Sequence, residues 1–194
     1  VRSAMARLLA GPLGWWDLAV AVGLVAAHPF AEWAIHVYLL HLKPFSFRGR
    51  QVELITAREH RWHHERPHDL YAVLLGPKEV IALFGLVIPL VALVLCGPVA
   101  LLGGPWYPMA ILTAMAVGGA LIFIYEWTHF LIHTAHRPKT RLYRAVWRTH
   151  RLHHFKNEHF WHGITTTVAD KVLRTSPEPR DVERSPTART LDVN

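Results

Sequence analysis

The chain has 194 residues, of which 52% are hydrophobic, and its formal net charge is +7 at pH 7. This length allows one domain, and a mean hydropathy of +0.18 is high for a soluble protein. Basic residues lie between apolar runs without alternating with aromatic residues, so we expect no nucleic-acid partner. The single cysteine, Cys96, can form no disulfide within the chain and indicates a reducing compartment.

Three apolar segments are long enough to cross a bilayer. They cover about residues 15–41, 80–95 and 107–133, and an uncharged turn at 97–105 joins the last two. The first segment has a second interpretation, in which Pro29 breaks it into a kinked hairpin that does not fully cross. We therefore predict an all-α, integral-membrane helical bundle of about three or four membrane segments.

The distribution of lysine and arginine predicts the orientation of these segments. Seven such residues lie between the first and second segments, twelve follow the third, and the 97–105 turn has none. The N-terminus and the turn are therefore expected outside the cell. The histidine clusters are expected on the cytoplasmic face, where they form a histidine-rich helical cap.

The chain divides into three parts by composition. Residues 1–14 form an N-terminal segment that is too short for a convincing signal peptide. Residues 15–174 form the membrane-embedded domain. Residues 175–194 are rich in proline, arginine and glutamate with almost no apolar content, which predicts a disordered C-terminal tail.

Ten of the fifteen histidines form two similar sets, one in each half of the chain. Each set combines a pair four or five residues apart with an HxxHH motif, which on a helix directs three imidazoles into one cavity. Histidine is the commonest protein ligand for transition metals, so we predict a site for two metal ions. The predicted ligands are His36, His41, His60, His63, His64, His129, His133, His150, His153 and His154.

The spacing of His36 and His41 is unusual, because residues five apart lie about 140° from each other on a regular helix. A helix end, a local π-bulge, or ligation of different metals by the two residues would each explain it. The other five histidines are not assigned as ligands; His28 and His68 are expected not to bind metal, and the roles of the rest are open. These are His136, His159 and His162.

Carboxylates are expected around the ligands, because a metal-bound imidazole usually donates its second N–H to one. Glu126 is notable, since it lies in an apolar run one helical turn before His129, although a position at the membrane interface also explains it. The candidates for this role are Glu32, Asp69, Glu126 and Asp170, with Glu59, Glu65 and Glu158 as further acidic residues nearby. Candidate substrate contacts, for which ordinary packing is the alternative, are Trp127, Phe160, Trp161 and His162.

The motifs resemble the fatty acid hydroxylase and sterol desaturase superfamily over about residues 30–175, most closely its fatty acid 2-hydroxylase branch. The similar stretches are Glu32-Trp33, HRWHHERPHD at 60–69 with Pro77, YEWTH at 125–129, HHFKN at 153–157, GITT at 163–166 and DKV at 170–172. The departures are Val37 where arginine is common, Trp161 and His162 where glycine or apolar residues are usual, and Arg174 where glycine is usual. They affect the choice of substrate, since the ligand positions are intact.

The resemblance implies a monooxygenase that uses two iron ions and O2 to hydroxylate a fatty acyl chain, with 2-hydroxylation favoured; zinc can replace iron in a purified sample. The implied partners are a membrane lipid substrate and a separate electron donor of the ferredoxin or cytochrome b5 type. Within the same superfamily, a carotenoid ring hydroxylase or a sterol or lipid desaturase is the alternative. A membrane metal transporter, a metal-binding protein or a haem protein are the non-enzymatic alternatives.

Overall fold

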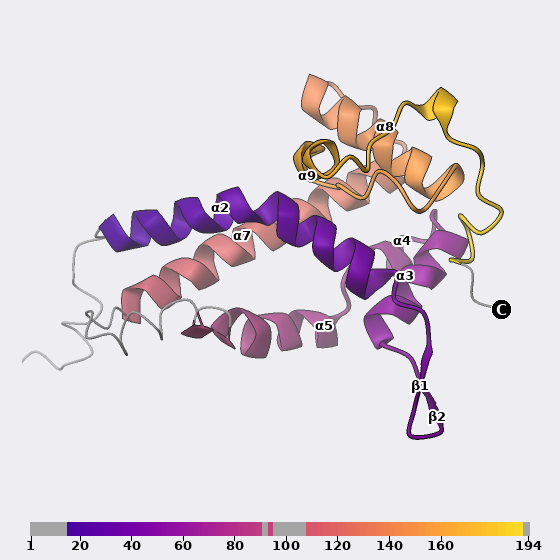
Figure 1. Cartoon of the computed structure of the whole chain (residues 1–194). Helices are drawn as coiled ribbons and strands as arrows, with labels where there is room; N and C mark the ends of the chain where they lie inside the picture. Colours follow the sequence, from indigo (N-terminus) through magenta and orange to yellow (C-terminus); the bar gives the residue numbers. More distant parts are fainter. Residues whose placement is uncertain (1–14, 91–92, 95–107, 192–194) are drawn as a thin grey trace, which may run out of the picture. The chain divides into compact units, whose positions relative to one another are not determined.

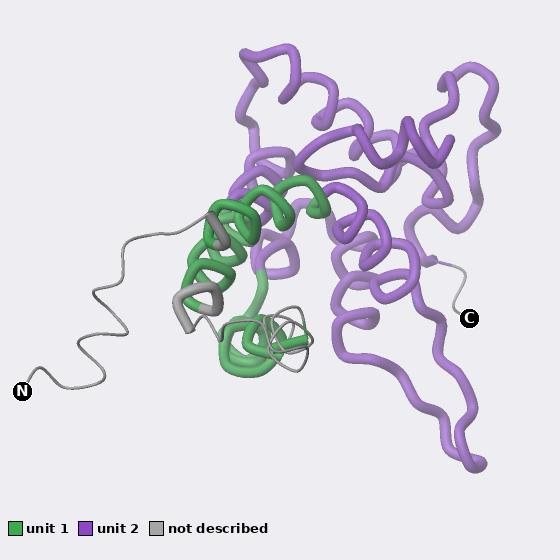
Figure 2. The backbone as a smooth tube through the Cα atoms, turned by 60° about the vertical axis from the view of Figure 1, so that its left-hand side comes forward, with its two compact units in different colours: residues 1–28, 75–123 green, residues 29–74, 124–194 purple. Residues whose placement is uncertain are grey.

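A computed structural model describes residues 15–90, 93–94 and 108–191 (Figure 1). The expectations for residues 1–14, for Cys96 and for the 97–105 turn lie outside the described residues. The chain forms two compact units, coloured separately in Figure 2. Unit 1 comprises residues 1–28 and 75–123, and unit 2 comprises residues 29–74 and 124–194.

Three helical stretches are long and apolar enough to cross a membrane, as the sequence predicts: Asp17–Leu40, Leu70–Leu90 and Leu112–His133. Helix α2 (Trp15–Ile35) continues through Pro29, so the alternative of a hairpin broken at this proline is wrong. The second stretch begins earlier than predicted, with α4 (Leu70–Val73), α5 (Pro77–Ala82) and the π-helix η2 (Leu83–Val87).

Unit 1 contains most of α2, α5 and the first part of α7 (Pro108–His133). The hydroxyl of Thr113 on α7 donates a 2.6 Å hydrogen bond to Asp17 on α2, which gives this charge a partner inside an apolar helix. Gly119 on α7 faces the ring of Phe84, which a Cβ at this position would approach to 2.9 Å. A small residue here therefore lets the helices pack closely.

Unit 2 contains the end of α2, the π-helix η1 (His36–Leu40) and the last part of α7. Its other helices are α3 (Ile55–Glu65), α4, α8 (Arg141–Phe155) and α9 (Val168–Val172), with a 3-10 turn at Pro179–Asp181. The unit also contains an antiparallel hairpin, β1 (Phe45–Phe47) and β2 (Arg50–Val52), which the sequence did not predict. Its two-residue turn has positive φ at both Arg48 (50°) and Gly49 (75°), as the favoured hairpin turns require. The fold is otherwise helical, as predicted.

A small apolar core holds the helices of unit 2 together. Ile132 of α7, Val146 of α8 and Ile164 of the following loop are each at most 1% exposed and pack together. Tyr125 and Trp147 pack against them. This core fixes the end of α7 against α8, and both helices carry histidines on the adjoining turns.

The described part of the C-terminal segment differs from the disordered tail that its composition predicts. The Ser185 amide donates a 2.8 Å hydrogen bond to the Lys156 carbonyl, and Ala188 and Leu191 are buried at 4% and 6% exposure. The segment is held mainly by backbone and polar side-chain hydrogen bonds, which is why its low apolar content suggested disorder.

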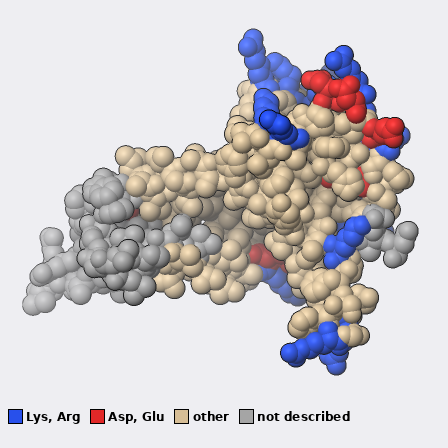
Figure 3. Space-filling model, viewed as in Figure 1, with Lys and Arg blue, Asp and Glu red and all other residues tan. Residues whose placement is uncertain are grey.

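Lys, Arg, Asp and Glu side chains gather visibly on the surface of unit 2 (Figure 3).

Candidate metal centre

All ten predicted ligands lie in unit 2, where they form two groups of five. Within each group, one ligand nitrogen from each residue lies within 4.8 Å of all the others. The first histidine group consists of His36, His41, His60, His64 and His153. The second histidine group consists of His63, His129, His133, His150 and His154.

Each HxxHH motif is divided between the two groups, which differs from our expectation of three imidazoles in one cavity. His60 and His64 of α3 join the first group, and His63 joins the second. In α8 the motif is divided in the same way, with His153 alone in the first group. Positions i and i+4 lie about 40° apart on a helix, whereas i+3 and i+4 differ by about 100°, so the middle histidine points to the neighbouring group.

The His36 and His41 pair is explained by a π-helix, one of the three explanations that the spacing allowed. The segment His36–Leu40 is π-helical, and the His41 amide donates to the His36 carbonyl at 3.2 Å. A π-turn brings residues i and i+5 to the same side, so both side chains belong to the first group. Their ring centroids are 5.0 Å apart. The geometry therefore disfavours the explanation in which His36 and His41 bind different metals.

The distances between ligand nitrogens fit a shared metal ion. The Nε2 atom of His150 lies 3.1, 3.0 and 2.9 Å from the Nε2 atoms of His129, His133 and His154. One ring nitrogen has a single N–H or a single lone pair, so it cannot satisfy three such contacts as hydrogen bonds. Nitrogens bound at ~2.1 Å to one ion lie about 3 Å apart when adjacent and at most about 4.2 Å apart. A cation between them would accept all four lone pairs.

The first histidine group shows the same close approach. His36 and His60 have their Nε2 atoms 3.1 Å apart, and His64 and His153 have theirs 3.2 Å apart. The Nε2 atom of His41 is buried and has no hydrogen-bond partner among the described residues. This arrangement leaves buried lone pairs without donors, and such groups are costly unless something binds them.

Burial also keeps these imidazoles in the neutral form that binds metal. It lowers the pKa of His64 to about 4, although the hydrogen bond to the Ala188 carbonyl opposes the shift. Burial, and then the neighbouring imidazoles, lower the pKa values of His60, His150 and His153 well below the usual range of histidine. Neutral imidazoles at physiological pH have a lone pair available, so no proton has to leave when a metal binds.

Backbone carbonyls, which the sequence analysis did not consider, orient three rings of the first group. The Nδ1 atoms of His36, His64 and His153 lie 2.7–2.8 Å from carbonyl oxygens. A carbonyl can only accept, so each Nδ1 carries the proton and each Nε2 keeps its lone pair for a metal. The carbonyls belong to His162, Ala188 and Phe160 respectively. A carbonyl has no signature in residue type, so no sequence motif could have identified them.

Two of the four carboxylates predicted to lie around the ligands, Asp170 and Glu32, hold the backbone of the loop after α8. Asp170 is fully buried and accepts hydrogen bonds from the amides of His162 (3.0 Å) and Gly163 (2.7 Å). Glu32, at 5% exposure, accepts from the amides of Ile164 and Thr165. Both therefore act on the loop whose carbonyls orient the histidines.

The remaining acidic candidates lie in other surroundings. Asp69 accepts from the Tyr71 amide and caps α4. Glu126 is half-buried on α7, one turn before His129. Glu158 is 2% exposed and accepts hydrogen bonds from Ser185 and Thr187 of the C-terminal segment.

The candidate substrate contacts fall into different environments. Trp127 is 53% exposed on α7, and its ring stacks on that of Phe130 at a centroid distance of 5.9 Å. Trp161 is 1% exposed, and its indole N–H donates to the Pro177 carbonyl, so packing explains its side chain. His162 is 3% exposed and lies beside the first group, with ring centroids 5.4 Å from His36. Phe160 is half-buried next to Trp161.

The histidines outside the predicted set lie outside both groups. His162 is the nearest to a group, whereas His159 has a side chain that is 70% exposed and lies 3.5 Å from Glu158. His68 and His136 are exposed, and His28 lies on α2 in unit 1.

Three apolar spans together with two groups of five converging imidazoles fit a membrane protein with a histidine-rich metal site. Comparison with known proteins makes the class specific. The family model described as fatty acid hydroxylase matches residues 21–175, and the chain belongs to this family.

Two curated relatives come from Arabidopsis thaliana. The dihydroceramide fatty acyl 2-hydroxylase FAH2 is 29% identical over 161 residues, which cover 80% of this chain and 62% of the relative. The dihydroceramide fatty acyl 2-hydroxylase FAH1 is 26% identical over 149 residues, covering 76% and 56% respectively. The chain thus spans about three fifths of the length of the curated relatives it matches.

The fold also matches a solved structure, full-length Scs7p, of which only the hydroxylase domain is visible. The TM-score is 0.66 at 24% identity, and the match covers 88% of this chain and 59% of that chain. The likeness confirms the fold.

Proposed function

We propose that the protein is an O2-dependent hydroxylase of a fatty acyl chain in a membrane lipid, with two iron ions held by the two histidine groups. The observation that carries this proposal is the convergence of ten buried imidazoles into two five-nitrogen groups in a chain of the fatty acid hydroxylase family. The curated relatives are named for the fatty acyl group of dihydroceramide, which favours hydroxylation at acyl carbon 2 here.

The reaction converts a C–H bond, O2, two electrons and two protons into an alcohol and water. When bound, the iron pair supplies the oxygen activation that side chains alone cannot perform. An electron donor, which we propose to be a separate protein of the ferredoxin or cytochrome b5 type, supplies the electrons.

The chain's own residues hold the ligands and exclude water. His64, His150, His153 and His154 are fully buried, so any bound ion is surrounded by protein. The loop at 160–165, fixed by Asp170 and Glu32, keeps the first histidine group in position through two of its carbonyls. A dry, fixed ligand set limits the loss of reactive species to solvent.

We propose that the acyl chain approaches from the membrane along α7. Trp127 lies within the apolar span and is half exposed, which suits contact with a lipid chain. Phe160 and His162 are proposed to line the route near the histidines, while Trp161 is assigned to packing. The excess of lysine and arginine between and after the spans favours a cytoplasmic position for the histidine groups.

The test is hydroxylation by the purified protein. The protein, loaded with iron in detergent, is mixed with a ceramide carrying a saturated acyl chain, a chemical or enzymatic reductant and isotopically labelled O2. We expect one labelled oxygen in the acyl chain at carbon 2, together with two irons per chain. His150→Ala, which removes the nitrogen shared by three contacts, should abolish the product, whereas His28→Ala should retain it.

Each other outcome identifies an alternative. Oxygen incorporation into a carotenoid ring but not an acyl chain would contradict the substrate class, and a new double bond without oxygen would indicate a desaturase. Two bound metals with no lipid product from any of these substrates would refute the enzymatic proposal and favour metal binding or transport.

A further inference from the structure

The two histidine groups differ in how their rings are held. In the first group, three Nδ1 atoms donate to backbone carbonyls. In the second group, the backbone carbonyls of Pro67 and Val73 interact with His133 and His129, whereas the buried Nδ1 atoms of His63, His150 and His154 have no hydrogen-bond partner among the described residues. An imidazole whose second nitrogen is hydrogen-bonded is fixed in tautomer and orientation, which strengthens metal binding.

One of the three carbonyls comes from the C-terminal strap, which we define as residues 183–191. His64 donates from Nδ1 to the Ala188 carbonyl at 2.8 Å. The next residue, Arg189, donates from Nε to the carbonyl of His64 itself at 2.7 Å and also to the carbonyl of Glu65. The strap thus holds both the ring and the backbone of one ligand.

The strap is tied to the other side of the first group as well. Ser185 and Thr187 donate from their hydroxyls to Glu158 at 3.0 and 2.6 Å, and the Ser185 amide donates to Lys156. Glu158 and Lys156 lie in the loop that follows His153 at the end of α8. The strap therefore links the segment after His153 to the end of α3, where His64 lies.

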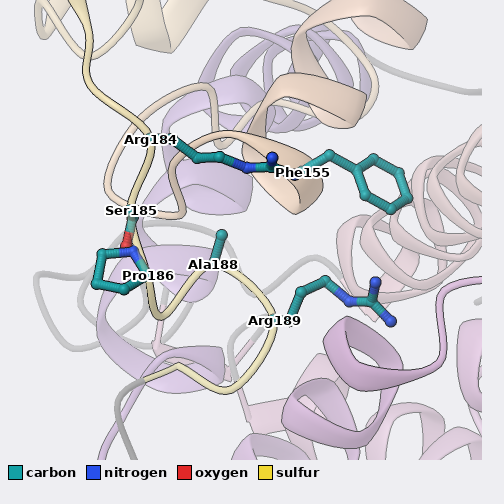
Figure 4. Close-up of a pocket in the computed structure, with 6 residues that line it drawn as sticks. All are labelled: Phe155, Arg184, Ser185, Pro186, Ala188 and Arg189. Carbon is teal, nitrogen blue, oxygen red and sulfur yellow. The ribbon is translucent and has the colours of Figure 1, made fainter.

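Figure 4 shows how the side chains of the strap lie around a surface hollow beside Phe155. Arg189 extends from the strap toward the end of α3, where it donates to the His64 carbonyl, and its guanidinium lies 5.8 Å from the centre of the Phe155 ring. Arg184 in the same strap is exposed and lines the same hollow. Arg184 can therefore serve as a matched control for Arg189, because of the two arginines only Arg189 donates a hydrogen bond to the backbone of a predicted ligand.

We propose that the C-terminal strap is a positioning element for the first histidine group, so that the two metal ions are held with unequal dependence on it. Loss of the strap weakens the metal site of the first group, and the site of the second group persists. This inference rests on the metal-binding part of the proposed function. A lost partner of a ligating imidazole typically weakens metal affinity about 10- to 100-fold, and this sets the expected effect.

The experiment is a zinc titration of the metal-free full chain in detergent, in competition with a chelator of known affinity. The wild type is expected to bind two zinc ions. Arg189→Ala should weaken one of the two sites at least about 10-fold, and Arg184→Ala should weaken neither. Thr187→Val should act in the same direction as Arg189→Ala, and Thr187→Ser, which keeps the hydroxyl that reaches Glu158, should restore the affinity.

The affected site is identified by combining variants. In a His150→Ala background the second group is disabled, and the remaining affinity should fall on addition of Arg189→Ala. In a His153→Ala background the first group is disabled, and Arg189→Ala should then have no effect. Cobalt(II) absorption spectra, recorded in parallel, should change for the first site alone.

Equal weakening of both sites by Arg189→Ala would overturn the proposal, because it would indicate general unfolding. Unchanged affinity at both sites, or fewer than two zinc ions in the wild type, would also overturn it. Two intact zinc sites in a protein that hydroxylates no lipid would refute the proposed enzymatic function alone. The two proposals can thus fail separately.

Discussion

Arg174 and Trp161 have left-handed backbones at positions where the family motifs usually have glycine or, for Trp161, glycine or an apolar residue. Substitution by glycine at both positions tests the free-energy cost of this backbone conformation. Arg174 has φ of 58° and Trp161 has φ of 60°. An L-residue in this region costs roughly 1–2 kcal/mol relative to glycine. Glycine recovers this amount but loses about 0.5–1 kcal/mol through the entropy of the unfolded chain.

The side chains give the two substitutions opposite signs. Arg174 is exposed, so Arg174→Gly should stabilise the protein by about 0.5–1 kcal/mol. Trp161 is 1% exposed and donates its indole N–H to Pro177. Removing a buried tryptophan side chain costs about 3–5 kcal/mol, and the hydrogen bond adds about 1 kcal/mol. After relief of the backbone, Trp161→Gly should still destabilise by about 3–5 kcal/mol.

The assay is thermal unfolding in detergent, monitored by circular dichroism for both variants and also by intrinsic fluorescence for Arg174→Gly. Arg174→Ala serves as the control, because alanine keeps the backbone cost while removing the side chain. We expect the melting temperature to rise for glycine and not for alanine at this position. Equal effects of the two substitutions would refute the argument from backbone conformation.

Two further predictions concern the loop that orients the first histidine group, and a third concerns removal of the metal. Gly163→Ala should prevent stable folding or metal loading, because a Cβ there would lie 2.1 Å from the Thr166 carbonyl; normal expression and metal content would contradict this. Asp170→Asn should lower the free energy of unfolding by about 2 kcal/mol, because the side-chain amide has one oxygen and cannot accept both backbone N–H groups that the carboxylate accepts. Chemical unfolding measures this loss. The control is Asp69→Asn at the exposed helix cap, which should cost less than about 1 kcal/mol. Chelator treatment of wild-type protein should release metal and lower the melting temperature, because an ion that binds only the folded state stabilises it by an amount that grows with the logarithm of its free concentration. An unchanged melting temperature would argue that the histidine groups are not occupied.

The sequence predicted the parts of the fold that depend on apolar length and on helical spacing. Apolar length alone identified the spans that end at Leu40 and His133. Helical spacing brought together the histidines of the HxxHH motifs, although it did not predict that His63 and His64 would face different groups. That division depends on how α3 lies between the other elements, and a repeat within one helix contains no such information.

The sequence could not predict the parts of the centre that depend on backbone atoms. The orientation of His36 comes from a carbonyl at position 162, and that of His64 from a carbonyl at position 188. Any residue presents a carbonyl, so its use depends on the path of the chain. The C-terminal segment was predicted to be disordered for the same reason, because its partners are mostly backbone groups and short polar side chains.

Trp161, one of the departures from the family motifs, connects the loop after α8 to the C-terminal segment. Trp161 takes a position where glycine or an apolar residue is usual, and its indole donates to the carbonyl of Pro177, six residues before the strap begins. Its amide also donates to the Thr175 carbonyl at 2.8 Å. A large side chain in a strained backbone is retained only when its surroundings hold it there. The same contacts connect the loop that orients His36 and His153 with the C-terminal segment that orients His64, so the three fixed rings of the first group depend on one continuous stretch from residue 160 to residue 191.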